Sequence, residues 1–177
     1  MVITYIAFLR GINVNGRIIK KTDLQNCFES LKFKNVKTIL QSGNVVFESS
    51  ETHQSKLKKI IEEALEKRFK YPAKIILTDI DSLQKIIKNY PFTADPNKHQ
   101  YIVFLSEDIR KELLSAEQLD PKVDAIKSGD MVVYWLVTKG QTVKSIFGKL
   151  LAKSKYRDIS TTRNMNTLEK IMKALEI

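Results

Sequence analysis

Cysteine is nearly absent from this sequence of 177 residues, whose one thiol, Cys27, cannot form an internal disulfide. Disulfides persist in oxidising compartments and are rare in reducing ones. We therefore predict a cytoplasmic protein. Cys27 falls on the apolar face of a predicted helix, which indicates a buried structural thiol and not a nucleophile.

Long apolar runs are also lacking. The apolar run at residues 2–9 ends at Arg10 and Gly11, far short of the roughly 20 residues that cross a bilayer. It has no basic segment before it and no small-residue cleavage site after it, as a secretory signal would. The run predicts a buried first strand, and we expect no membrane association.

Motifs for metals and phosphates are missing as well. The two histidines, His53 and His99, stand in separate predicted loops without a cysteine or carboxylate at ligand spacing. Neither the phosphate-binding loop G-x-x-x-x-G-K-[ST] nor the dinucleotide fingerprint G-x-G-x-x-G occurs. We therefore expect no metal site and no cofactor.

Positive charge is abundant, with a net charge of +10 that is concentrated at the two ends of the chain. Such a surplus attracts phosphate groups and nucleic acids. The basic residues are mostly lysines with few aromatics among them, however. Lysine used for solubility is the interpretation that we favour.

The first half of the sequence predicts alternating strands and helices. Apolar residues at helical spacing or in short β-branched runs predict strands at 2–9, 36–41, 44–49 and 73–78 and helices at 22–31, 54–70 and 80–89. This order, βαββαβ, is the split βαβ or ferredoxin-like arrangement.

The second half repeats this order at an offset of roughly 90 residues. Strands are predicted at 100–106, 123–127 and 131–138 and helices at 107–116 and 142–153. The last strand is not expected to return, because residues 154–163 are polar and basic, and a C-terminal helix follows. The predicted fold is therefore α+β, with two ferredoxin-like βαββα(β) subdomains in tandem, the second lacking its last strand and ending in a C-terminal helix.

The boundary between the two subdomains is predicted from proline. Residues 91–99 contain Pro91 and Pro96 and show no periodicity, which is typical of a linker. The predicted organisation is an N-terminal subdomain at 1–90, a linker at 91–99 and a C-terminal subdomain at 100–177.

Three polar segments follow or join apolar elements. They are residues 10–16, which leave the first strand, residues 41–44 between two strands, and residues 160–167 before the last helix. Each has a plain structural interpretation, as a turn that needs positive φ, as a hairpin turn, and as a helix cap in which Asn166 pairs with Glu169. The polar density of the third segment exceeds what capping requires, and Arg163 beside a helix start suits a phosphate or carboxylate.

The same three segments carry a resemblance to a known family. The blocks Leu9-Arg10-Gly11-Ile12-Asn13-Val14, 41–47 (QSGNVVF) and 161–167 (TTRNMNT) resemble the signature blocks of an uncharacterised bacterial family, domain of unknown function 1697. The resemblance implies a two-subdomain α+β fold of ferredoxin-like character and no known activity. The family usually has Trp where this chain has Met165, and methionine there fits a packing role.

Our leading functional hypothesis is a small binding protein for an anionic ligand, such as a nucleotide or a nucleic-acid segment. We expect the ligand in a polar cleft between the halves, lined by Arg10, Asn13, Gln41, Ser42, Asn44, Thr161, Arg163, Asn164 and Asn166.

Two alternatives stay open. One is a hydrolase or transferase acting on a phosphorylated compound, with Arg10 and Arg163 neutralising charge; it lacks an evident general base, and no catalytic residue is assigned. The other is an RNA- or DNA-binding protein that uses its basic surface. Aromatic side chains exposed on a sheet face would favour it, and Phe104, Tyr134 and Trp135 are the residues to inspect together with Tyr101, although burial fits them better.

Overall fold

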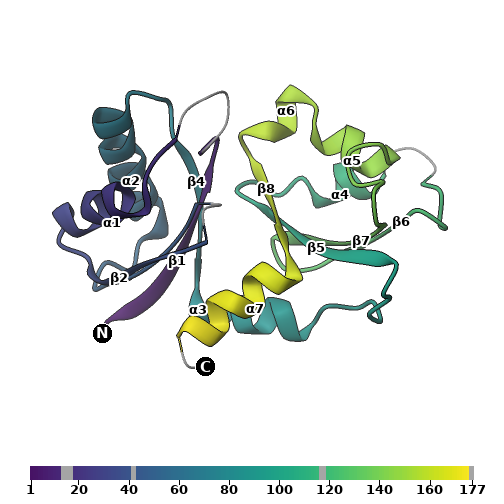
Figure 1. The fold of residues 1–177 in the computed structure, drawn as a ribbon, viewed down its shortest axis with the longest axis horizontal. Coiled ribbons are helices and arrows are strands. Elements are labelled where there is room, and N and C mark those ends of the chain that lie inside the picture. The colour runs from purple at the N-terminus through teal and green to yellow at the C-terminus, as the bar shows by residue number, and fades with distance from the viewer. Residues whose placement is uncertain (13–17, 41–42, 116–118, 176–177) are drawn as a thin grey trace. The chain divides into compact units, whose positions relative to one another are not determined.

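The computed structural model describes residues 1–12, 18–40, 43–115 and 119–175 of the chain. These residues form two compact units, Met1–Leu83 and Gln84–Ile177, each described by itself. The predicted α+β class is confirmed, because each unit contains helices and a four-stranded antiparallel sheet (Figure 1).

The first unit follows the predicted βαββαβ order. Its elements are β1 (Ile3–Arg10), α1 (Lys21–Ser30), β2 (Lys34–Ile39), β3 (Asn44–Ser49), α2 (Gln54–Phe69) and β4 (Lys74–Asp79). The sheet order is β2-β3-β1-β4, with all neighbours antiparallel. Helix α3 (Ile80–Lys88) begins in this unit and continues into the next.

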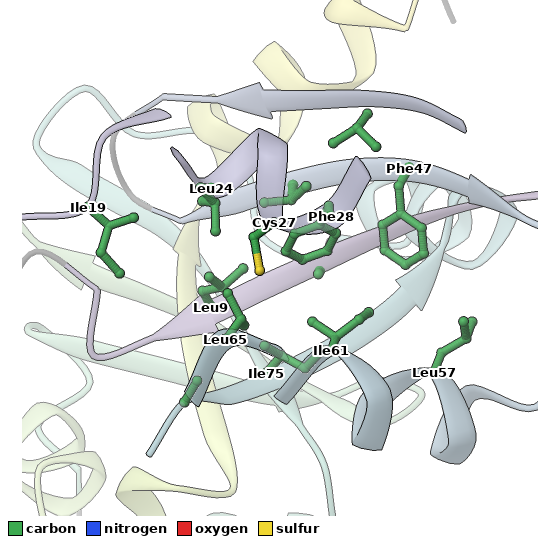
Figure 2. Packing of buried hydrophobic residues seen from close by; sticks show 14 of the residues in the cluster. Leu9, Ile19, Leu24, Cys27, Phe28, Phe47, Leu57, Ile61, Leu65 and Ile75 are labelled. Atoms are coloured by element: carbon green, nitrogen blue, oxygen red, sulfur yellow. The ribbon is translucent and has the colours of Figure 1, made fainter. Parts of the chain in front are cut away.

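The core of the first unit lies between α1, α2 and one face of its sheet. Leu24, Cys27 and Phe28 point from α1 toward the strands, and α2 contributes Leu57, Ile61 and Leu65 (Figure 2). Burial raises the pKa of the Cys27 thiol. The predicted structural role of this cysteine therefore agrees with its place in the core.

The second unit has the same succession of strands. Its elements are β5 (Lys98–Leu105), α4 (Arg110–Leu114), β6 (Asp124–Ser128), β7 (Val132–Thr138), α5 (Ile146–Leu151), α6 (Ser154–Arg157), β8 (Ser160–Asn164) and α7 (Met165–Ala174). The sheet order is β6-β7-β5-β8, which corresponds strand for strand to the order in the first unit.

The prediction that the second half lacks its last strand is therefore wrong. Strand β8 pairs antiparallel with β5 from Leu105↔Ser160 to Tyr101↔Asn164. Strand β8 has the sequence STTRN, which contains no apolar residue. It therefore lacks the alternation of apolar and polar residues that predicts a strand, although threonine itself favours β structure. Backbone pairing with a strand more than 50 residues earlier in the chain decides its conformation.

The two faces of the second sheet are covered by different helices. Helices α4, α5 and α6 lie on one side, over a core that includes Trp135 and Phe147, and α7 lies on the other side (Figure 1). Tyr134, whose hydroxyl donates to the carbonyl of Ile86 at 3.0 Å, ties the end of α3 to this unit. Met165 is buried at the start of α7, in agreement with the packing role predicted for it.

A buried carboxylate organises the core of the second unit. Asp124 accepts a hydrogen bond from the indole Nε1 of Trp135 at 2.8 Å and one from the backbone N–H of Phe147 at 3.4 Å. These bonds satisfy buried donors that would otherwise destabilise the fold. Asp124 thus links β6, β7 and the start of α5.

Candidate functional site

Two of the polar segments meet at one end of the first sheet. The backbone N–H of Leu9 donates to the carbonyl of Gly43 at 2.8 Å. A Cβ atom on Gly43, whose φ is +71°, would lie 2.6 Å from Cγ2 of Ile12. Glycine is therefore required here both for the backbone conformation and for the close approach of the two segments.

Asn44 has a structural role in this arrangement. It is buried at the start of β3, and its Nδ2 donates to the carbonyl of Ile39 on β2 at 3.0 Å. The positive φ angles next to the turn belong to Leu40 and Gly43. The interpretation of this segment as a hairpin turn is supported, because Asn44 closes the pair of strands across it.

Arg10 and Asn44 lie on the same face of the first sheet. Phe8 is directly opposite Asn44 in the register, and Arg10 follows Phe8 by one strand repeat of two residues. Side chains alternate between faces along a strand, and directly opposed residues share a face. Arg10, half-buried, and Asn44 are therefore brought together on the face that α1 and α2 do not cover.

The third polar segment is divided by the alternation of β8. Thr161 is opposite Phe104 and Arg163 is opposite Ile102, so these two side chains share one face of the sheet. Asn164 is opposite Tyr101 and belongs to the other face. Thr161 is buried, and Arg163 is half-buried with its Nη1 donating to the carbonyl of Thr162 at 3.1 Å.

Asn164, and not Asn166, caps helix α7. The Oδ1 of Asn164 accepts a hydrogen bond from the backbone N–H of Asn166 at 2.9 Å. The predicted capping box of Asn166 and Glu169 is thus displaced by two residues, because β8 carries the backbone up to Asn164 before the helix begins. Asn166 itself is exposed.

Four of the six predicted site residues that the structure describes form two pairs, one in each unit, and Asn164 and Asn166 belong to neither pair. The structure brings Arg10 together with Asn44, and Thr161 together with Arg163. Asn13, Gln41 and Ser42 lie outside the described residues. The predicted cleft depends on the placement of one unit against the other, and it stays a prediction.

A cavity that was not predicted from the sequence lies in the second unit. Its volume is about 440 Å³, and α4, α5 and α6 contribute its lining. On one wall, Glu112 of α4 accepts hydrogen bonds from Nζ of Lys155 at 2.5 Å and from the hydroxyl of Tyr156 at 2.7 Å. These two bonds hold the pKa of Glu112 below its usual range, so the carboxylate is charged at neutral pH.

The other wall of this cavity begins on α5. Ile146, Lys149 and Leu150 line it from that helix, and Lys153 lines it from the position before α6. Ile146 is an apolar residue of the helix predicted at 142–153, yet it is 36% exposed. The lysines at positions 149 and 153, between the two apolar residues and after them, were the signal that this face is not core.

Comparison with known proteins places the chain in a family. Residues 2–134 match the family model described as protein of unknown function (DUF1697). The chain belongs to this family. The resemblance stated from the polar segments is confirmed over this range, which contains the first two segments and ends before β8.

A solved structure extends the comparison to the whole chain. It is described as that of a conserved bacterial protein from Streptococcus pneumoniae, with 21% sequence identity, a TM-score of 0.83 and full coverage of both chains. At this identity the likeness shows that the two proteins share a fold, and it shows nothing about function. No curated protein matches the chain. No helix among the described residues has the length and apolar character needed to cross a membrane.

Proposed function

We propose that this protein is a small binding protein for an anionic ligand, a nucleotide or another compound that carries a phosphate group, and that Arg163 binds its charge. The observation that carries the proposal is the position of Arg163. It is a half-buried arginine on β8, on the same face as the buried hydroxyl of Thr161, and it immediately precedes the cap of α7.

The chemistry of this position favours an anion. A guanidinium group is always charged and presents five N–H donors in a rigid fork that matches phosphate and carboxylate oxygens. The N-terminus of α7, a helix of 10 residues, adds a partial positive charge. Both contributions act at the same end of β8.

The first unit offers a similar pair, Arg10 and Asn44, on the face of its sheet that α1 and α2 do not cover. Asn44 already donates to the carbonyl of Ile39. Arg10 is the permanently charged residue of this pair, so we assign ligand binding to it and test it separately from Arg163.

Aromatic burial argues against a nucleic-acid platform as the main function. Base stacking needs exposed aromatic faces, and Phe104, Tyr134 and Trp135 are all buried. A compact phosphate-bearing ligand fits the described residues better.

A thermal-shift screen tests the proposal. The full chain is screened against nucleotides, sugar phosphates and oligonucleotides, and a ligand at 100 times its Kd should stabilise it by about 2.7 kcal/mol. For a chain of this size that corresponds to a rise in Tm of roughly 5–10 °C. Arg163→Ala should abolish the shift, and Arg163→Lys should retain part of it because it keeps the charge and loses the fork.

The control is Lys170→Ala, which removes an exposed positive charge from α7 and should leave the shift unchanged. Arg10→Ala is measured in the same screen. A ligand shift that survives Arg163→Ala, or no shift with any phosphate compound, would refute the proposal.

We also infer that each unit is a ferredoxin-like repeat. The inference is supported by the shared element order and by the corresponding sheet orders β2-β3-β1-β4 and β6-β7-β5-β8. Amide hydrogen exchange tests this inference at β8, the strand that was not predicted from the sequence. Slow exchange along Ser160–Asn164 is the expected result, and exchange as fast as in an open loop would contradict it.

A further inference from the structure

The cavity of the second unit has an apolar wall of which one residue, Ile146, is exposed and not part of the core. Phe147, the next residue of α5, is fully buried in the core. Ile146 is 36% exposed and lines the cavity together with Leu150, which is half-buried and also packs against that core. An apolar side chain left in contact with water is stabilised when another apolar group covers it.

The charged part of the lining has a cationic excess. Glu112 is the acidic residue of the lining, and its carboxylate is occupied by Lys155 and Tyr156. Lys149 and Lys153 are exposed and form no ion pair with any residue that the structure describes. The cavity therefore has two ammonium groups available for an anion.

The wall that contains Glu112, Lys155 and Tyr156 is held together by their mutual contacts. Tyr156 is buried, its hydroxyl is fixed on Glu112, and Nζ of Lys155 lies 4.6 Å from the centre of its ring. Because these contacts join α4 to α6, the cavity is held open by interactions that do not involve Lys149 or Lys153. A ligand would enter a largely preformed site, which lowers the entropic cost of binding.

We propose that this cavity binds a small amphipathic anion, a carboxylate or phosphate monoester carried on a short apolar or aromatic body. The anionic group contacts Lys149 and Lys153, and the apolar body covers Ile146 and Leu150. The volume of about 440 Å³ falls within the range of small-molecule sites, roughly 300–1,000 Å³. The cavity shares no lining residue with Thr161–Asn166, so it is a second site, independent of the one proposed for Arg163.

A matched pair of fluorescent dyes provides the test on the full chain. The first dye is 8-anilino-1-naphthalenesulfonate, whose sulfonate stands in for the carboxylate or phosphate. The second is N-phenyl-1-naphthylamine, which has the same aromatic body and no charge. We expect saturable binding of the anionic dye, with a Kd at least about tenfold below that of the neutral dye at low salt.

Substitution of the lysines locates the site. The double variant Lys149→Gln/Lys153→Gln should raise the Kd of the anionic dye about tenfold and leave that of the neutral dye within about twofold. The control Lys127→Gln/Lys139→Gln removes two exposed charges elsewhere in the same unit, outside the lining, and should change neither Kd by more than about twofold. Equal losses in the two double variants would overturn the proposal, as would equal affinity for the two dyes or no saturable binding.

Substitution of the apolar wall is a second, independent measurement. Ile146→Ser should weaken both dyes about fivefold or more, because both lose an apolar contact. Val143→Ser is the matched control, since Val143 is 78% exposed and does not line the cavity. A loss in Val143→Ser equal to that in Ile146→Ser would contradict the assignment.

Displacement experiments then distinguish the two sources of the anion. Octanoate supplies a carboxylate and 1-naphthyl phosphate supplies a phosphate monoester on an apolar body. Displacement of the bound anionic dye by either compound supports the site and identifies its preferred head group. Displacement by neither refutes it. Arg163→Ala should leave dye binding unchanged, so failure of this proposal is distinguishable from failure of the function proposed for Arg163.

Discussion

Gly148 permits a close backbone contact that the sequence does not reveal. Gly148 lies inside α5, where a glycine would ordinarily weaken the helix. A Cβ atom there would lie 1.8 Å from the backbone oxygen of Thr142. The side chain of Ser145 also accepts a hydrogen bond from the N–H of Gly148 at 3.1 Å. The absence of a side chain is therefore what allows the preceding turn to pack against α5.

Gly148→Ala should destabilise the protein by about 3 kcal/mol, since the added methyl group meets backbone that cannot rotate away. Gly140→Ala is the comparison. Gly140 has a φ of +78° and no described atom within 4 Å of the added carbon, so only the left-handed backbone costs energy, about 1–2 kcal/mol. Urea unfolding of the two variants measures both values, and a smaller loss for Gly148→Ala than for Gly140→Ala would contradict the packing shown here.

Helices α1, α2 and α3 and the strands β1–β7 lie within about two residues of their predicted bounds, because apolar periodicity is a local property. The C-terminal helix α7 was expected without bounds. Strand β8 and the outward position of Ile146 were not predicted. Both depend on which distant segment lies opposite, β5 for the strand and the α4–α6 cavity for Ile146.

The start of α2 carries a pH-dependent contact. The carboxylate of Glu51 accepts hydrogen bonds from Nζ of Lys56 at 2.5 Å, from the backbone N–H of His53 at 3.1 Å and from the ring of His53 at 2.9 Å. The bond from Lys56 contributes most, and together they lower the pKa of Glu51 to about 2. A lowered pKa means that the charged form stabilises the folded state.

This contact should be fully present above about pH 4.5 and lost as the pH falls toward 2. Glu51→Gln should therefore be less stable than the wild type at pH 6, and the difference should vanish near pH 2. Urea midpoints measured across this range test the expectation. Glu63→Gln, at an exposed α2 residue whose ion pair with Lys59 is 4.0 Å long, is the control. A Glu51→Gln difference that persists at pH 2 would show that charge is not its cause.

For the whole molecule, we expect the net charge of +10 to attract nucleic acid only by long-range electrostatics, without recognition of bases. Of the aromatic residues that could have formed a stacking surface, Phe104, Tyr134 and Trp135 are buried and Tyr101 is half-buried. Binding to nucleic acid should then consist of lysine–phosphate contacts, which weaken steeply with salt.

A labelled single-stranded oligonucleotide should accordingly bind with a Kd that rises more than about tenfold between 50 and 200 mM salt. Oligonucleotides of different base composition should bind alike. Fluorescence anisotropy measures both properties. Tight binding that persists at 200 mM salt, or a clear preference for one base, would instead indicate a specific nucleic-acid site.

The sequence by itself determined the α+β class, the repeated order of elements and the family, because periodicity and short motifs are encoded locally. It also located the polar segments. Tertiary structure alone decided that residues 160–164 complete the second sheet, that Thr161 and Arg163 share a face from which Asn164 is excluded, and that Ile146 lines a cavity. These three features depend on strand register or on packing between helices that are far apart in the chain. The local pattern of residues determines neither the register nor the packing.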